Sequence, residues 1–182
     1  GDAWTFTAPC PNGVRTAAPT LPAADIAGLM GLDVDDLADD PIWVDTGADQ
    51  LLVPLKNVDA LRRAHPDASQ LERWQANSLG RKVCYLFAFD PNRRQDGRDV
   101  VVTRYFYAKP GGGVQEDAGT GSACANLGGW LRHRQDALPP SFLVGEGDQM
   151  GRPCRVLLDV QADGRIQVGG RALEIGRGTV DV

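Results

Sequence analysis

Residues 116–131 constrain the fold of this chain more than any other stretch, because a glycine-rich loop leads there directly into a helix without charges. The stretch reads Glu-Asp-Ala-Gly-Thr-Gly-Ser-Ala-Cys-Ala-Asn-Leu-Gly-Gly-Trp-Leu. Backbone N–H groups in the first turn of a helix have no partner inside the helix, and the helix dipole adds positive character there. The pattern therefore predicts an anion site at the helix start.

Four residues of this stretch are candidates for the site. Gly121, like Gly119, has no Cβ, so a ligand can approach its backbone closely. We expect Thr120 or Ser122 to cap the first turn. Asp117 lies just outside the turn, where it can meet a polar group of the same ligand. The alternatives for Asp117 are that it donates a proton to the ligand, if burial keeps it neutral, or that it only forms the turn.

The helix itself is predicted to be buried. Its apolar side chains form a wide stripe made of Ala123, Cys124, Leu127, Trp130 and Leu131. A glycine inside a helix costs about 1 kcal/mol relative to alanine, so Gly128 and Gly129 indicate close packing, against a sheet. A simpler interpretation is a buried helix with a glycine-rich entry and no ligand. We expect Cys124 to be a small core residue rather than a reactive thiol.

The composition narrows the class of protein. The 182 residues include 22 glycines and 12 prolines, which favour many turns and a β-rich fold. The net charge is −5, and the sequence has no block of like charges. Both features argue against nucleic acid or an anionic membrane as partner. Four scattered cysteines and two histidines argue against a metal site and fit reduced thiols in the cytoplasm. Neither a membrane-spanning run nor a signal peptide is visible.

Periodicity along the chain predicts an α+β fold with one buried helix between hairpins. Helices are expected at residues 22–30, 58–64 and 68–79, with one further helical turn at 33–37. Strands are expected at residues 3–8, 41–46, 50–55, 83–89, 98–107, 142–144, 154–160, 165–168 and 171–182. Residues 9–22 are rich in proline and read as a connector. Residues 90–97 read as a polar turn between two strands.

Residues 104–123 resemble the signature of the phenazine-biosynthesis isomerase family, the PhzF-like proteins. They read Arg-Tyr-Phe-Tyr-Ala-Lys-Pro-Gly-Gly-Gly-Val-Gln-Glu-Asp-Ala-Gly-Thr-Gly-Ser-Ala. An Arg-x-Phe strand, a glycine turn, Glu-Asp and a Thr-Gly-Ser-Ala helix start carry the likeness. Residues 45–47 with 51–55, and residues 168–181, are similar to other family elements. The resemblance therefore runs along nearly the whole chain.

The resemblance implies a diaminopimelate-epimerase-like fold, in which two lobes enclose the active site between them. Each lobe is a curved antiparallel or mixed β-sheet, barrel-like in shape, wrapped round a central buried helix. This chain matches only the second lobe. Residues 1–18 are expected to be a strand and linker that belong to, or abut, a first lobe. Residues 19–182 are expected to form the C-terminal PhzF-like lobe.

The resemblance also implies roles for three site residues. Asp117 matches the family aspartate that orients the substrate and assists proton transfer. Gly121 and Ser122 match the positions where the helix start holds the substrate carboxylate. The glutamate that moves the proton is expected from a first lobe or a second chain. Glu116 is the nearest candidate base in this chain, while both histidines lie in the wrong segments.

The first hypothesis for the function, which the resemblance implies, is an isomerase. It would move a proton within a small unsaturated or cyclic carboxylic acid, without metal or organic cofactor. Family members often pair as homodimers. A second hypothesis is a non-catalytic half, a subunit, or a binding module for small acids. A third is an epimerase or racemase of the same fold. Related enzymes of that kind carry a cysteine at about the position of Ala118, so the missing thiol argues against it.

Overall fold

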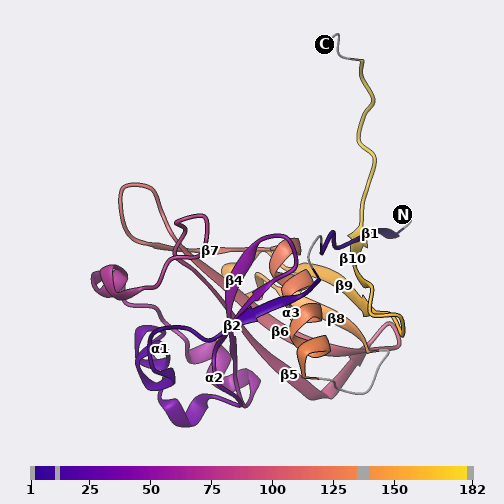
Figure 1. Cartoon of the computed structure of the whole chain (residues 1–182). Helices are drawn as coiled ribbons and strands as arrows, with labels where there is room; N and C mark the ends of the chain where they lie inside the picture. Colours follow the sequence, from indigo (N-terminus) through magenta and orange to yellow (C-terminus); the bar gives the residue numbers. More distant parts are fainter. Residues whose placement is uncertain (1–2, 11–12, 135–139, 180–182) are drawn as a thin grey trace.

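The computed structural model describes residues 3–10, 13–134 and 140–179, which form one large mixed β-sheet and its covering helices (Figure 1). The order of strands across the sheet is β1-β10-β9-β8-β6-β5-β4-β3-β2, and β7 pairs with β6 outside this path. The bounds are β1 Ala3–Thr7, β2 Arg15–Ala17, β3 Ile42–Asp45, β4 Asp49–Pro54, β5 Val83–Gln95, β6 Arg98–Ala108, β7 Val114–Asp117, β8 Ser141–Glu146, β9 Cys154–Val160 and β10 Ile166–Arg171.

The sheet is mixed and open. β4 pairs with β5, and β6 with β8, in parallel, while the other neighbouring strands are antiparallel. β1 and β2 are its two edges, so the sheet does not close on itself. The expected barrel-like shape is therefore wrong, because a barrel is a closed sheet. β2 has only three residues, and a short edge strand offers few unpaired backbone groups to another strand. The division of the chain at residues 18 and 19 stays a prediction.

The helices lie on two different sides of this sheet. The α-helices are α1 Ala23–Leu29, α2 Val58–Arg63 and α3 Gly121–His133, and the 3-10 turns are η1 Val34–Asp36, η2 Ala68–Arg73 and η3 Asp148–Met150. In Figure 1, α1 and α2 lie together at the lower left, away from α3. In the described part of the chain, no helix is both long and apolar enough to span a bilayer.

Two apolar cores occupy the two faces of the central strands. In β5, Cys84 and Leu86 face the core under α1 and α2, while Tyr85 and Phe87 face the core around α3. The same alternation runs through β4, where Leu52 joins the α3 side. A strand buried on both faces is apolar at successive positions, and this explains the continuous apolar run at 83–89.

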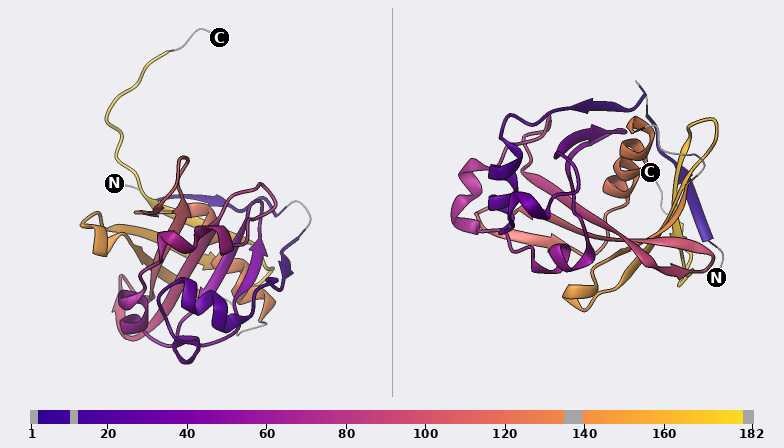
Figure 2. Two further views of the ribbon diagram at one scale, coloured as in Figure 1. Left: turned by 90° about the vertical axis from the view of Figure 1, so that its left-hand side faces the viewer. Right: turned by 90° about the horizontal axis from the view of Figure 1, so that it is seen from below.

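Helix α3 packs against β3, β4, β9 and β10, which come from both halves of the sheet. Figure 2 shows the helix in the hollow of the curved sheet. A Cβ on Gly128 would lie 2.6 Å from Cγ2 of Ile166, and a Cβ on Gly129 would lie 2.9 Å from Cγ2 of Thr46. The two glycines therefore let β10 and β3 approach the helix on two sides, and the predicted close packing against a sheet is confirmed.

Two predicted elements differ from the structure around the long β5–β6 hairpin. The helix expected at 68–79 is only the 3-10 helix Ala68–Arg73, which begins at the N-cap Asp67 and ends where Trp74 adopts an extended backbone. The polar segment 90–97 is mostly strand, since β5 continues to Gln95 through a bulge. Asp96 and Gly97 alone form the turn, and both have positive φ.

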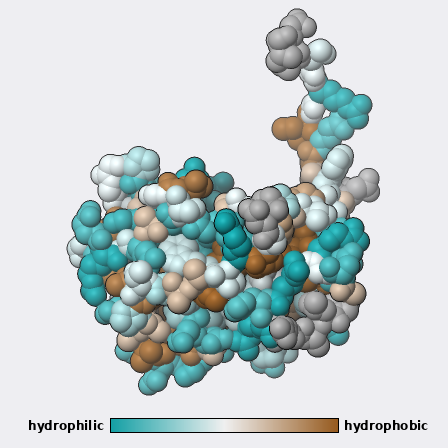
Figure 3. Space-filling view, in the orientation of Figure 1, coloured by the Kyte–Doolittle hydropathy of each residue, from teal (hydrophilic) through white to brown (hydrophobic). Residues whose placement is uncertain are grey.

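The end of the chain also differs from expectation. Strand β10 ends at Arg171, and residues 172–179 form neither strand nor helix, so the strand predicted at 171–182 is wrong over those residues; 180–182 lie outside the described part. This segment extends away from the body (Figure 1). Its Leu173 and Ile175 are 80% and 95% exposed, and Figure 3 shows hydrophobic side chains on it above a largely hydrophilic body.

Candidate active site

The loop between β7 and α3 is closed by Asp117. Its Oδ1 accepts a hydrogen bond from the N–H of Ala118 at 2.8 Å, and its Oδ2 accepts one from the Thr120 hydroxyl at 2.8 Å. Thr120 is the N-cap residue, but its side chain makes no capping bond to the helix. The expected side-chain cap by Thr120 is therefore wrong, because the hydroxyl donates to Asp117 and closes the turn that leads into the helix.

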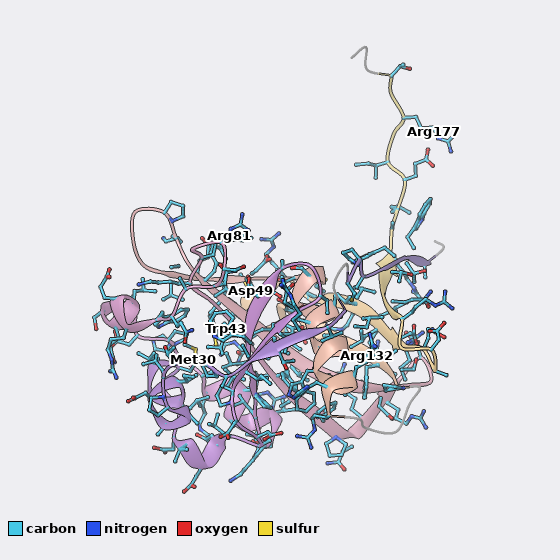
Figure 4. The ribbon with its side chains drawn as sticks, in the orientation of Figure 1. Met30, Trp43, Asp49, Arg81, Arg132 and Arg177 are labelled. Carbon is cyan, nitrogen blue, oxygen red and sulfur yellow. The ribbon has the colours of Figure 1, made fainter. Side chains whose placement is uncertain are left out.

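The start of α3 is open to solvent. A Cβ built on Gly121 would have no protein atom within 4 Å, and the side chain of Ser122 is exposed. The N–H groups of Gly121 and Ser122 have no acceptor among the residues that the structure describes. Figure 4 places Asp49 and Arg81 toward the end of the molecule where α3 begins, and Arg132 toward the other end of the helix. The open end of α3 is thus a cluster of hydrogen-bond donors.

Gly119 has a different role from Gly121. A Cβ on Gly119 would lie 2.6 Å from Sγ of Cys154, so a side chain there would collide with β9. The glycine at 119 is explained by packing inside the protein. Of the two loop glycines that the sequence suggested for close approach of a ligand, only Gly121 faces open space.

Strand β4 contributes a residue that sequence reasoning missed. Nε2 of Gln50 donates to Oγ of Ser122 at 3.0 Å, and the Gln50 side chain is nearly fully buried. Asn126 lies one turn further along α3 and also binds Gln50. The signal was a glutamine inside the apolar strand 50–55, because a buried amide requires polar partners.

Strand β8 contributes a second missed residue, Glu146. It is 1% exposed, its Oε2 accepts a hydrogen bond from the N–H of Thr120 at 3.1 Å, and its Oε1 has no partner among the described residues. Burial raises the pKa of this carboxyl to about 7, although the Thr120 N–H opposes the shift. The charge of Asp117 raises the pKa further. An acid at the end of the apolar strand 142–145 was the available signal.

Glu116 points to the other side of β7. Residues 116 and 117 are consecutive in a strand, so their side chains alternate between its faces. Glu116 forms a two-pronged ion pair with Arg104, at 3.0 Å and 2.8 Å. Arg104 also donates to the carbonyl oxygens of Leu61 and Ala64. Glu116 therefore joins β6 and β7 to α2 and does not face the helix start.

The remaining candidate groups lie elsewhere or in the core. Cys124 is fully buried, and burial raises its pKa far above the usual range of a thiol, which agrees with a core residue. Nδ1 of His133 lies 3.5 Å from the Thr16 hydroxyl, at the end of α3 away from the open turn. Among the described residues, no three His, Cys, Asp or Glu side chains form a group that could hold a metal ion.

Comparison with known sequences gives a consistent set of relatives. A family model described as phenazine biosynthesis-like protein (PhzC-PhzF) matches residues 8–178. An uncharacterised isomerase of Pasteurella multocida is 33% identical over 156 residues, which are 85% of this chain and 48% of the relative. The trans-2,3-dihydro-3-hydroxyanthranilate isomerase of Pseudomonas fluorescens is 31% identical over 141 residues, 74% of this chain and 45% of that enzyme.

Solved structures of similar proteins share the fold of this chain. A Bacillus anthracis protein described as a PhzF-family phenazine biosynthesis protein superposes with a TM-score of 0.71 at 18% identity, covering 92% of this chain and 57% of that one. A predicted epimerase of Pseudomonas aeruginosa gives a TM-score of 0.59 at 27% identity, covering 86% and 52%. The chain spans about half the length of the curated relatives that it matches.

Proposed function

Because the chain belongs to the phenazine biosynthesis-like family, we propose that it is the substrate-holding part of an isomerase. The enzyme moves a proton within a small unsaturated or cyclic carboxylic acid, and this chain binds the carboxylate. The named relatives support the reaction class, since one of them isomerises trans-2,3-dihydro-3-hydroxyanthranilate, a ring-containing acid. The reaction that we propose needs no metal and no organic cofactor.

The open start of α3 carries this proposal. Gly121 faces space with no protein atom within 4 Å of the position of a Cβ, and the adjacent N–H groups lack acceptors in the described part of the chain. A carboxylate placed there gains hydrogen bonds from the backbone and the favourable end of the helix dipole. Holding the carboxylate in this way draws negative charge away from the carbon skeleton and acidifies the neighbouring C–H bond.

We assign Asp117 the role of an anchor that accepts a hydrogen bond from the substrate. Its two oxygens already accept bonds from the Ala118 N–H and the Thr120 hydroxyl. Each oxygen keeps a lone pair that can accept a hydrogen bond from a substrate hydroxyl or amine.

The group that removes the proton comes, in this proposal, from a first lobe or a second chain. Glu116 is engaged by Arg104, and Glu146 is sealed beneath the loop. Glu146 contacts the N-cap residue Thr120 from the buried side, so neither glutamate is exposed at the open helix start. We therefore propose that the chain is one lobe of a diaminopimelate-epimerase-like pair, with the catalytic glutamate on the facing lobe. A positioned base of this kind contributes roughly 10²–10⁴-fold to the rate.

The test separates binding from turnover. The ¹⁵N-labelled chain is titrated with trans-2,3-dihydro-3-hydroxyanthranilate, and the amide resonances of residues 121 and 122 should shift most. Unmoved resonances at saturating acid would show that the helix start is no carboxylate site. Turnover is then followed in heavy water with the chain alone and with the facing lobe supplied. Deuterium uptake with bond migration is expected only in the second case, and turnover by the chain alone would refute the external base.

A further inference from the structure

Two buried amides behind the helix start are held in a single orientation by the backbone. The N–H of Thr46, which can only donate, lies 2.9 Å from one amide atom of Asn126, and the carbonyl of Ala48, which can only accept, lies 2.7 Å from the other. The first atom must be the oxygen Oδ1 and the second the nitrogen Nδ2. The Thr46 hydroxyl donates to the same Oδ1 at 2.7 Å.

The orientation of Asn126 fixes the orientation of Gln50. Nδ2 of Asn126 carries only hydrogens to donate, and it contacts one amide atom of Gln50. That atom must therefore be the oxygen Oε1. The nitrogen Nε2 is left to face Ser122, and it donates to the serine oxygen at 3.0 Å. The side chains of Asn126 and Gln50 are 0% and 4% exposed, so water does not compete for these bonds.

The orientation of Gln50 in turn decides what Ser122 can do. Because Nε2 of Gln50 only donates, the oxygen of Ser122 must accept this bond. The hydroxyl hydrogen cannot point back to Gln50, and no described residue accepts it. The exposed Ser122 thus presents an O–H donor beside the free N–H groups of the first helical turn.

We propose that Gln50 and Asn126 are positioning residues that hold the Ser122 hydroxyl as a donor, so that this site selects an ionised carboxylate over neutral analogues. The inference rests on the proposed function and names the origin of its selectivity. The Ser122 hydroxyl and the free N–H groups of the first helical turn then all donate. An ionised carboxylate meets these donors with two accepting oxygens, whereas a carboxamide meets them with one oxygen and turns an NH₂ group, itself a donor, toward the others.

The discriminating measurement is a ratio of affinities. Anthranilate and its carboxamide differ only in the group that meets the helix start, and their dissociation constants are measured by NMR titration of the chain. The Gln50→Glu variant replaces the donor Nε2 with an oxygen of similar size. This oxygen accepts from Ser122 and turns the hydroxyl away from the ligand. The preference of the wild-type chain for anthranilate over the carboxamide should fall by about tenfold or more.

Controls separate hydrogen-bond direction from charge and from loss of fold. Gln75→Glu adds the same charge beside the core under α1, on the face of the sheet opposite α3, and keeps both bonds from Thr20, because its oxygen is the acceptor there. That variant should keep the wild-type preference. In Ser122→Ala, adding Gln50→Glu should change the preference much less than it does in the wild-type chain. If Gln50→Glu does not fold, the Gln50→Met variant is measured in its place. It should lower the preference for anthranilate over the carboxamide several-fold.

The titrations distinguish a failure of the positioning role from a failure of the proposed function. If the wild-type chain prefers anthranilate, and a folded Gln50→Glu or Gln50→Met variant keeps that preference, the positioning role of Gln50 is wrong while the carboxylate site stands. If the wild-type chain binds neither compound at the helix start, the proposed function itself fails and the positioning role falls with it.

Discussion

The carboxyl Oε2 of Glu146 lies 3.1 Å from the backbone nitrogen of Thr120, so a buried acid at the end of β8 supports the loop that leads into α3. The other oxygen of this carboxyl has no partner among the described residues. The ionised form is therefore buried with one oxygen unpartnered, and such a group is costly. Glu146 couples the stability of the protein to pH.

The first prediction is that stability falls as pH rises through the acidic to neutral range. Glu146 titrates near 4.5 when unfolded, and burial raises its pKa to about 7 in the folded protein. The folded state therefore holds the proton longer, and the free energy of unfolding decreases between these two pH values by at most roughly 3 kcal/mol. Urea denaturation at pH 4.5, 6 and 8 measures this decrease.

Glu146→Gln provides the matched control for this pH effect. Its amide oxygen can still accept the Thr120 N–H, but the side chain carries no charge at any pH. The variant should be more stable than the wild-type protein at pH 8 and should lose the part of the pH dependence that Glu146 causes. Identical pH profiles for the two proteins would show that Glu146 titrates normally.

The second prediction concerns Gly121 and separates the site from the fold. A Cβ at this position meets no protein atom within 4 Å, and the backbone is not in the left-handed region. Gly121→Ala should therefore leave the free energy of unfolding unchanged or raised by up to about 1 kcal/mol, since alanine favours helices. The added methyl group lies in the space proposed for the carboxylate. Binding of anthranilate should weaken by about tenfold or more.

Gly28→Ala is the matched control for this variant. Gly28 is an exposed glycine in α1, and its Cβ would also meet nothing within 4 Å. The same chemical change there should leave binding unaltered. Unaltered binding in Gly121→Ala, measured by the same titration, would remove Gly121 from the site.

The third prediction tests whether Asp117 acts on the substrate or only forms the turn. Asp117→Asn keeps an oxygen for the Ala118 N–H, and its amide nitrogen can donate to the Thr120 oxygen, so the loop should remain folded. In the enzyme with its facing lobe, turnover should fall by about 10²-fold or more because one accepting oxygen of the anchor is replaced by an NH₂ group. Thermal unfolding and steady-state kinetics together check both expectations.

Asp117→Ala separates the two roles further. It removes both acceptors and should destabilise the loop as well as abolish turnover. If Asp117→Asn retains wild-type turnover, Asp117 is a turn-forming residue and nothing more.

The sequence was sufficient for features that depend on neighbouring residues, and insufficient where distant residues decide. The loop and helix at 116–131 and the apolar strand at 83–89 follow from local patterns. Gln50 and Glu146 do not, because a polar residue in an apolar strand requires a partner without revealing which one. Here the partners are a serine 72 positions away in the chain and a backbone N–H 26 positions away.

The C-terminal segment illustrates the same limit for secondary structure. Leu173 and Ile175 alternate with polar residues, a pattern that predicts a strand. A strand is stabilised by hydrogen bonds and side-chain contacts with neighbouring strands, and residues 172–179 have no paired strand in the described part of the chain. The local pattern alone was therefore misleading.

The fourth prediction tests the glycine pair that lets α3 lie against the sheet. A Cβ on Gly128 would approach Cγ2 of Ile166 to 2.6 Å and Cδ1 of Leu158 to 3.2 Å, so β9 and β10 would have to shift. Gly128→Ala should lower the free energy of unfolding by about 1–3 kcal/mol, less any gain in helix propensity. Chemical denaturation measures the loss, with Gly28→Ala as the control that adds a methyl group without a collision.

A second substitution shows whether the collision with β10 is the cause. Ile166→Ala removes the side chain that the new methyl group would meet and leaves a cavity when made alone. In the double variant, the methyl group introduced by Gly128→Ala occupies part of that cavity. The double variant should be more stable than the sum of the two single losses predicts. Strict additivity would mean that the glycine at 128 is not required by close packing against β10.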